Sequence, residues 1–312
     1  MKIVVTGALG HIGSHLVRAL PASFPRAEIV MVDNLMTQRF ASLFELPSIG
    51  RYRFIEGDVR RLDLDATLKD THVVVHLAAI TDAAGTADKA ELVEANNFEA
   101  TRAIAEACVR RGTRLIVLSS TSVYGPQSAR VSEDCGLDEL KPQSPYATTK
   151  LKEERLLQRL AAESGLRCVC FRFGTIFGAS PGMRFHTAVN KFCWQAVMGQ
   201  PLTVWKTAYH QVRPYLDLVD AGRAILHAIE RDLFDGRIYN VVTLNATVSQ
   251  LIDAIRAFVD PVATTFVDSP IMNQLSYEVA ADRFASQGFA FTGNLVRGIG
   301  DTVALLRVAN AR

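Results

Sequence analysis

The sequence has little of what marks secreted, metal-binding or nucleic-acid-binding proteins. Its five cysteines are an odd number without a Cys-x-x-Cys pair, which favours free thiols over a disulfide or metal framework. The seven histidines show no metal-ligand spacing, and a formal net charge of +2 leaves no electrostatic footprint for nucleic acid. We expect neither a bound metal nor a nucleic-acid partner.

Long apolar runs are also missing. No run approaches the ~18 residues of a membrane span, and Met1-Lys2 leads directly into Ile3, which leaves no room for a signal peptide. The sequence therefore predicts a soluble, cytoplasmic protein with no membrane partner.

Short apolar runs alternate with helical patterns over the first 173 residues. The expected strands are residues 3–5, 29–32, 53–55, 73–76, 115–118 and 169–171. The expected helices are residues 11–20, 64–69, 89–111 and 146–163. Apolar strands separated by helices indicate a parallel sheet covered on both faces, which is an α/β, doubly wound (Rossmann) fold.

The alternation ends after residue 173. Residues 174–184 are rich in Gly, Pro and Ser and are expected to form a loop. Further helices are expected at 185–198, 219–230, 248–258 and 294–308, and further strands at 202–205 and 238–242. We predict two domains, 1–173 for dinucleotide binding and 174–312 as mainly a smaller substrate-binding cap, with some elements returning to the main sheet.

A glycine-rich turn, Thr6-Gly7-Ala8-Leu9-Gly10-His11-Ile12-Gly13, separates the first expected strand from the first expected helix. Glycines allow a tight turn close to a pyrophosphate, whose charge the helix N-terminus stabilises. The alternative is a purely structural turn. The predicted cofactor contacts here are Gly7, Gly10, His11, Ile12 and Gly13.

Asp33 ends the second expected strand, twenty residues after Gly13. A carboxylate at this place accepts hydrogen bonds from an adenosine ribose and repels a 2′-phosphate. The position therefore favours NAD over NADP, although a lone Asp after a strand is often a helix cap.

Three further residue types that can carry chemistry stand in a serine cluster and in a later Tyr–Lys pair. Ser119–Ser122 begins where the fifth expected strand ends, which is where ligands bind in open parallel sheets. Tyr146 and Lys150 share a helical face, and a nearby ammonium favours the phenolate. Tyr146 is thus a candidate base toward a sugar hydroxyl. The alternative is that Tyr146 packs and Lys150 is solvated.

Additional short motifs are Asp33-Asn34-Leu35, Gly57-Asp58-Val59, His76-Leu77-Ala78-Ala79 and Ser119-Ser120-Thr121-Ser122-Val123-Tyr124-Gly125. With the glycine turn and the Tyr146–Lys150 pair, they resemble the extended short-chain dehydrogenases/reductases, in particular the NAD-dependent nucleotide-sugar epimerase/dehydratase branch typified by UDP-galactose 4-epimerase. The resemblance covers essentially the whole chain and is strongest through residue 178.

The resemblance implies NAD as cofactor, a nucleotide-diphosphate sugar as substrate and a homodimer through the two long helices. It implies that the catalytic residues are Ser120, Tyr146 and Lys150. The implied NAD contacts beyond the turn are Asp33, Asn34, Asp58, Val59, Leu77, Ala78, Ala79, Thr81, Asn97, Tyr146 and Lys150. The implied substrate contacts are Ser120, Thr175, Asn190, Val204 and Arg213, of which Arg213 holds the diphosphate.

The sequence departs from the family pattern in two places. Thr175 stands where the family has asparagine, and Met272–Leu275 occupies the neighbourhood of the family's R-x-G-D diphosphate clamp. Arg184 is a candidate to replace that cation, and an exposed arginine is the alternative.

The family resemblance also bears on the reaction. Relatives that eliminate water or carbon dioxide carry carboxylates within the segment that is Ser120-Thr121-Ser122 here, which has none. We therefore expect a 4-epimerase that acts through a transient 4-keto sugar. A 4,6-dehydratase, a decarboxylase, a uronate epimerase and a non-catalytic NAD-binding sensor remain alternatives.

Overall fold

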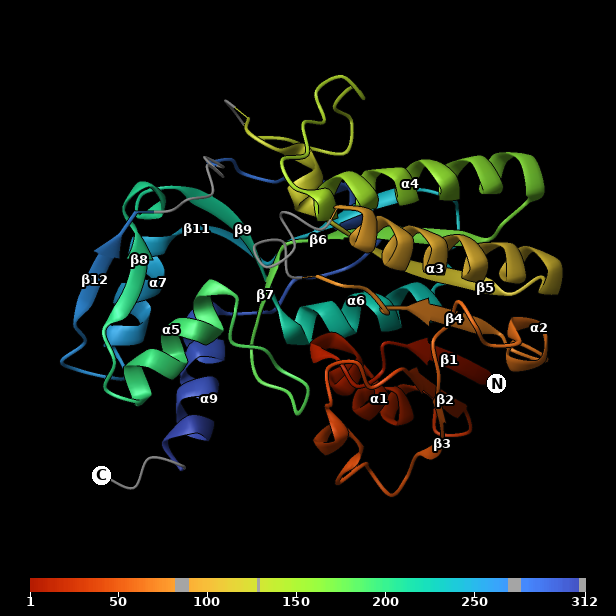
Figure 1. Cartoon of the computed structure of the whole chain (residues 1–312), viewed down its shortest axis with the longest axis horizontal. Helices are drawn as coiled ribbons and strands as arrows, with labels where there is room; N and C mark the ends of the chain where they lie inside the picture. Colours follow the sequence, from red (N-terminus) through yellow and green to blue (C-terminus); the bar gives the residue numbers. More distant parts are fainter. Residues whose placement is uncertain (82–89, 128–129, 269–275, 309–312) are drawn as a thin grey trace.

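A parallel sheet of seven strands organises the larger part of the molecule (Figure 1). This computed structural model describes residues 1–81, 90–127, 130–268 and 276–308. In sheet order the strands are β10 (Ile238–Val241), β6 (Cys168–Phe173), β5 (Arg114–Ser120), β4 (Val73–His76), β1 (Lys2–Thr6), β2 (Glu28–Asp33) and β3 (Arg51–Glu56). The strand order reverses between β1 and β4, and ligands of such sheets bind at the carboxyl ends beside this switch.

Helices cover both faces of the sheet. One face is covered by α1 (His11–Ser23) and α6 (Leu218–Glu230), and the other by α3 (Ala90–Arg111) and α4 (Pro145–Ser164) (Figure 1). Along β1, Ile3 and Val5 belong to the first core and Val4 to the second. Apart from the edge strand β3, whose residues are exposed or half-buried, the strands are mostly buried on both sides and form short apolar runs. The predicted doubly wound fold is confirmed.

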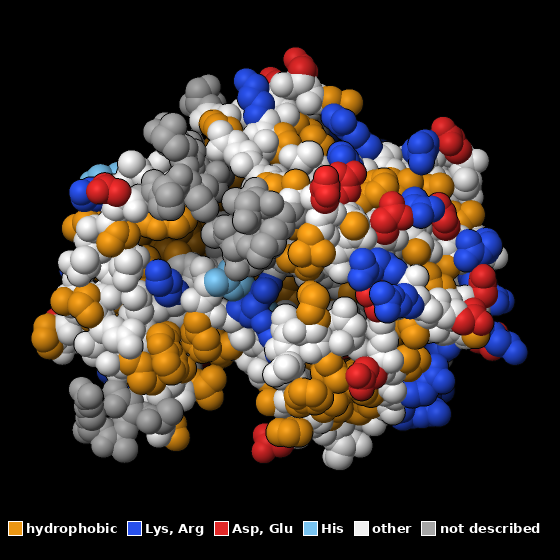
Figure 2. All heavy atoms as spheres, viewed as in Figure 1, with side chains coloured by type: hydrophobic (Ala, Val, Ile, Leu, Met, Phe, Trp, Pro, Cys, Tyr) orange, Lys and Arg blue, Asp and Glu red, His pale blue; other side chains and the backbone are white. Residues whose placement is uncertain are grey.

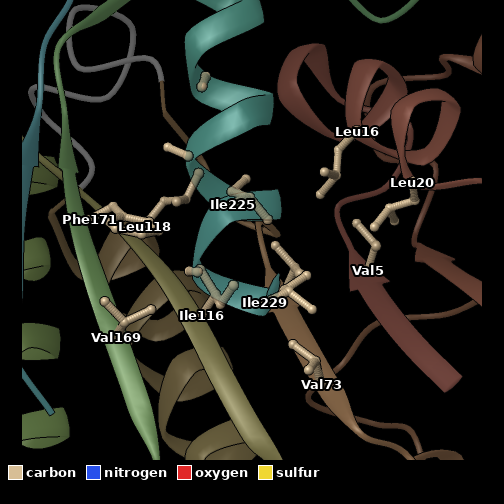
Figure 3. Close-up of a cluster of buried hydrophobic side chains, with 14 of the residues drawn as sticks. Val5, Leu16, Leu20, Val73, Ile116, Leu118, Val169, Phe171, Ile225 and Ile229 are labelled. Carbon is tan, nitrogen blue, oxygen red and sulfur yellow. The ribbon is translucent and has the colours of Figure 1, made fainter. Parts of the chain in front are cut away.

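The first core is drawn in Figure 3. Leu16 and Leu20 of α1 lie near Val5 of β1, while Ile225 and Ile229 of α6 face the strands β4 to β6. The structure therefore uses α6 and β10, both from beyond residue 173, to complete the main sheet and its cover. The division into domains at residue 173 stays a prediction.

The smaller part has its own sheets and core. The three-stranded sheet contains β11 (Leu244–Thr247), β9 (Val212–Asp217) and β7 (Thr175–Phe177), and the two-stranded one β12 (Thr264–Val267) and β8 (Leu202–Trp205). The helices α5 (Ala188–Val197), α7 (Val248–Arg256) and α9 (Leu295–Arg307) pack beside them (Figure 1). Phe177, Tyr215, Leu251 and Ile299 are buried in this third core.

Short helical turns complete the described chain. These are α2 (Leu64–Thr67), α8 (Asp282–Ala285) and the 3-10 turns η1 (Phe40–Leu43), η2 (Thr121–Tyr124) and η3 (Lys206–Ala208). None of the helices in the described ranges combines the length and the apolar character that a bilayer crossing requires. The five cysteines are free thiols.

Four strands of the smaller part correct the sequence-based expectation. The loop expected at 174–184 contains β7, and β9, β11 and β12 were not expected at all. Pro214 lies within β9, the central strand of its sheet, where proline is uncommon because it cannot donate a ladder hydrogen bond. β7 has only three residues, which is too short to show a pattern of its own.

Candidate active site

A pocket of about 320 Å³ lies at the carboxyl edge of the main sheet. Its walls come from the ends of β1, β2, β4, β5 and β6, from the helices α3 and α4, and from residues 174–176, 184, 186 and 187 of the smaller part. The predicted residues that line it are Gly7, Gly10, His11, Ile12, Gly13, Asp33, Asn34, Val59, Leu77, Ala78, Ala79, Thr81, Ser120, Tyr146, Lys150, Thr175 and Arg184. Figure 2 shows basic and histidine side chains where the two parts of the molecule meet.

Two glycines of the turn, Gly7 and Gly13, are packed so closely that neither admits a side chain. A Cβ on Gly7 would lie 2.7 Å from the backbone nitrogen of Ala78, and one on Gly13 would lie 2.4 Å from the Gly7 carbonyl oxygen. Gly7 also has a positive φ of 65°. Bare backbone and the first N–H groups of α1 therefore face the pocket, which is the surface that a pyrophosphate needs.

His11 connects this turn to the smaller part of the molecule. Its Nε2 donates to the carbonyl of Gly178, at 2.8 Å. Burial, foremost, lowers the pKa of His11 to about 4. At neutral pH the imidazole is therefore uncharged and acts as a hydrogen-bond donor across the two parts.

Asp33 is held in the pocket wall by two backbone groups. Its Oδ2 accepts from the Leu9 N–H and its Oδ1 from the Leu35 N–H, both at 3.0 Å. The Leu9 bond ties the end of β2 to the glycine turn, so the carboxylate does not cap a helix. The nearby Arg39 donates to the Gly182 carbonyl at 2.6 Å, which engages that guanidinium within the protein.

Two implied cofactor contacts do not line the pocket. Asp58 is bound by the Arg60 guanidinium, with Nε 2.9 Å from Oδ1, and this hydrogen bond lowers the pKa of Asp58. Asn97 brackets Ile80: its Oδ1 accepts from the Ile80 N–H at 2.8 Å and its Nδ2 donates to the Ile80 carbonyl at 2.9 Å. Asn97 thus supports the lining segment that ends at Thr81.

The three catalytic candidates come from two elements. Ser120 ends β5, and its Oγ accepts from the Ser122 N–H at 3.2 Å and the Ser122 hydroxyl at 2.9 Å. Tyr146 and Lys150 occupy the first two turns of α4, which begins after Ser144, whose Oγ accepts from the Ala147 N–H. Lys150 Nζ lies 5.8 Å from the centre of the Tyr146 ring. The predicted trio therefore shares one pocket.

The pKa of Tyr146 is raised in the structure, whereas the sequence predicted that Lys150 would lower it. Burial raises the pKa of Tyr146, the Lys150 ammonium lowers it, Glu153 raises it and Arg184 lowers it, and the net pKa is above its usual value. Lysine therefore acts in the expected direction, but burial outweighs it, because burial removes part of the water that would solvate the phenolate.

Glu153 is the residue that sequence reasoning missed. It is buried, and its Oε2 lies 2.9 Å from Lys150 Nζ. Burial lowers the pKa of Lys150, but Glu153 and Tyr146 raise it, and the net pKa is above its usual value. The ammonium therefore persists. The signal was present, because Glu153 lies seven residues after Tyr146, on the same face of the helix.

Three implied substrate contacts do not line the pocket described here. Asn190 is buried, accepts from the Gly178 N–H at 3.3 Å and donates to the Arg184 carbonyl at 3.2 Å. Val204 is 1% exposed within the core of the smaller part, which is the strand-packing alternative. Arg213 donates to Gln211 Oε1 at 3.0 Å. Residues Met272–Leu275 lie outside the described residues.

A family model described as the NAD dependent epimerase/dehydratase family matches residues 3–241. The chain belongs to this family. This match confirms the expected family, an enzyme of this kind and NAD as its cofactor. The glycine turn and Asp33 form a site that fits NAD. The cytoplasmic location and the homodimer stay predictions.

Individual relatives agree with this assignment. An uncharacterized UDP-glucose epimerase of Bacillus subtilis, YtcB, is 30% identical over 77% of this chain and 76% of its own length. A UDP-glucose 4-epimerase of Azospirillum brasilense is 32% identical over 72% of this chain and 68% of its own. The crystal structure of UDP-glucuronic acid 4-epimerase from Bacillus cereus, in complex with UDP-glucuronic acid and NAD, has a TM-score of 0.86 and 28% identity, with 99% of this chain and all of that chain covered.

Proposed function

We propose that this member of the family is a 4-epimerase of nucleotide-diphosphate sugars that works through a transient 4-keto sugar. The observation that carries the proposal is that the glycine turn, Ser120, Tyr146 and Lys150 all line one pocket. The names of the relatives support a UDP-sugar as the first substrate to test.

Each residue of the trio has a role that its position supports. Tyr146 accepts the proton of the sugar 4-hydroxyl and returns it, which is general base and then general acid catalysis. Lys150, whose ammonium is buried beside the ring, stabilises the phenolate that this requires. Ser120, at the end of β5, donates its hydroxyl to the substrate oxygen. When bound, NAD supplies the oxidant for C4 and the reductant that restores it.

The absence of carboxylates in the η2 segment supports epimerisation over elimination. Ser120, Thr121 and Ser122 offer hydroxyl groups alone, and neither an acid nor a base for removing water stands there. The keto sugar is then reduced again in the same pocket, and reduction from the other face of the ring yields the 4-epimer.

A second candidate, a 4-epimerase of nucleotide uronates, is favoured by Arg184. This guanidinium lines the pocket on the wall of the smaller part, together with Thr175 and Thr187. A guanidinium and hydroxyl donors are the groups that recognise a carboxylate. The Bacillus cereus enzyme with UDP-glucuronic acid bound supports the same choice of substrate.

The test is an activity screen of the purified protein with UDP-, GDP-, CDP- and dTDP-sugars, including a neutral hexose and a uronate for each available nucleotide. Products are identified by mass and NMR. The proposal expects a 4-epimer of unchanged mass. A product lighter by water or carbon dioxide, or no product with any sugar despite bound NAD, would overturn it, and the last outcome would favour the sensor.

The matched variant is Tyr146→Phe, which removes the hydroxyl and keeps the ring. We expect turnover to fall by about 100-fold to 10,000-fold, the range typical of a lost general base. NAD content, measured after release from the protein, should stay close to that of the wild type. Unchanged turnover would remove Tyr146 from the mechanism.

A further inference from the structure

A buried ion pair lies directly beside the proposed base. Lys150 and Glu153 are three residues apart on α4, and their side chains are 6% and 1% exposed. Lys150 lines the pocket, whereas Glu153 does not. The carboxylate therefore approaches the ammonium from the protein side, and a substrate in the pocket meets only the lysine.

Within the described residues, no ion pair ties Glu153 to a helix or strand other than its own. Its ionised partner is Lys150, and Thr101 of α3 is the polar side chain that acts on it from the neighbouring helix. An apolar residue would fill the same helix face without the desolvation penalty of a buried carboxylate. We therefore expect the carboxylate of Glu153 to act on Lys150 and, through it, on Tyr146.

Other charged or titratable groups also face these residues. They are His76 of β4, Cys170 of β6, Glu154 of α4 and Arg184 before α5. Burial, then Lys150, lowers the pKa of His76 to about 3, and burial raises the pKa of Cys170, so both are neutral near pH 7. Glu154 forms a bidentate ion pair with Arg172, whose Nε donates to Oε1 at 2.9 Å and whose Nη2 donates to Oε2 at 2.7 Å.

We propose that Glu153 is a positioning residue of this active site, which holds the Lys150 ammonium from the protein side and limits its electrostatic support of the Tyr146 phenolate. The inference rests on the proposed function. A lone ammonium beside Tyr146 would favour the phenolate strongly, whereas an ammonium paired with a carboxylate is nearly neutral at a distance. The opposite effects of Lys150 and Glu153 on the pKa of Tyr146 agree with this view.

The experiment compares the wild type with Glu153→Gln, which keeps the shape and removes the charge. The readout is the pH dependence of kcat/KM for 4-epimerisation. The active form requires the phenolate, so activity falls as the pH drops through the pKa of Tyr146. Removing a negative neighbour favours the anion, and the acidic midpoint should move to lower pH by about one unit. Relative activity well below the midpoint then rises about tenfold.

Two further variants complete the series. Glu153→Asp moves the charge away from Lys150 and should shift the midpoint in the same direction by less than one unit, so it carries the test if Glu153→Gln does not fold. Glu163→Gln removes an exposed carboxylate at the end of α4 and should leave the profile unchanged. A loss of equal size at every pH, with the midpoint unmoved in folded variants, would overturn the proposal.

A second readout separates this inference from the proposed function. The near-ultraviolet absorbance of tyrosinate, taken as the difference between a protein and the same protein with Tyr146→Phe, follows the ionisation of Tyr146 without turnover. If the wild type converts no sugar, the proposed function fails, but the absorbance titration still tests Glu153. We expect the titration of Tyr146 in Glu153→Gln to begin at lower pH than in the wild type, and coincident curves would contradict the role.

Discussion

The two walls of the pocket are built in different ways. On the side of the main sheet, the wall at the glycine turn is backbone, which contacts the segment after β4 at distances that exclude a side chain, and Asp33 is fixed by two N–H groups. This side also carries the side chains of Ser120, Tyr146 and Lys150. On the side of the smaller part, the wall consists of side chains on connecting segments, among them Thr175, Arg184 and Thr187. A backbone wall suits a ligand that never changes, and a side-chain wall allows the substrate to differ between relatives.

The strongest test of the backbone wall compares Gly7→Ala with Gly112→Ala. The two glycines have nearly the same φ, 65° and 62°, but a Cβ on Gly112 would meet no atom within 4 Å. Gly112→Ala should therefore destabilise the fold only through backbone strain, by about 1–2 kcal/mol. Gly7→Ala should lose about 2 kcal/mol more, because Leu77 and Ala78 must move.

The measurements are denaturant unfolding and NAD binding. The displaced segment after β4 lines the cofactor site, so Gly7→Ala should also bind NAD at least about tenfold more weakly, whereas Gly112→Ala should not. Equal effects of the two substitutions on both quantities would show that the close contacts do not matter.

The hydrogen bond between His11 of the glycine turn and Gly178 of the smaller part makes stability depend on pH. The pKa of His11 is lowered to about 4, foremost by burial, against about 6.5 in an unfolded chain. The unfolded state binds the extra proton, so this contribution is complete above pH 6.5 and is lost as the pH falls toward 4. His11→Gln keeps a donor for Gly178 but does not titrate. Between pH 7 and pH 4 the wild type should lose about 3 kcal/mol more stability than the variant.

The cofactor preference tests Asp33, where charge and geometry can be separated. Asp33→Ala should weaken NAD binding roughly tenfold and relax discrimination against NADP, because it removes both the acceptor and the negative charge. Asp33→Asn retains one acceptor oxygen and should mainly relax the discrimination. An unaltered ratio of NAD to NADP affinity in both variants would refute the assignment to the ribose.

The smallest effect is expected on the side-chain wall. Arg184→Gln should raise KM for a uronate several-fold, that is by about 1 kcal/mol, and change KM for a neutral sugar less, while NAD binding is retained. Arg159→Gln, an exposed arginine on α4, serves as the control. If the uronate and the neutral sugar respond equally, Arg184 does not recognise a carboxylate.

Burial and chain spacing explain which strands and site residues could be predicted from the sequence. The strands β1, β2, β4, β5 and β6 are mostly buried on both faces and flanked by helices, so their apolar runs were recognisable. β7 and β9 were not, because the first has three residues and the second contains Pro214. Glu153 was not predicted as a site residue, because a Glu three residues from a Lys on a helix usually forms an exposed ion pair with it.

By itself, the sequence determined the parallel sheet, the glycine turn, the acidic residue after β2 and the helical spacing of Tyr146 and Lys150. Each of these depends on neighbours along the chain, through the reach of a turn or the pitch of a helix. The tertiary structure decided which residues of the smaller part face the pocket. It brought Arg184 to the wall, left Val204 in a core and turned Asn190 toward the backbone of a connecting segment. Those outcomes depend on packing between segments distant in the chain, which local pattern does not encode.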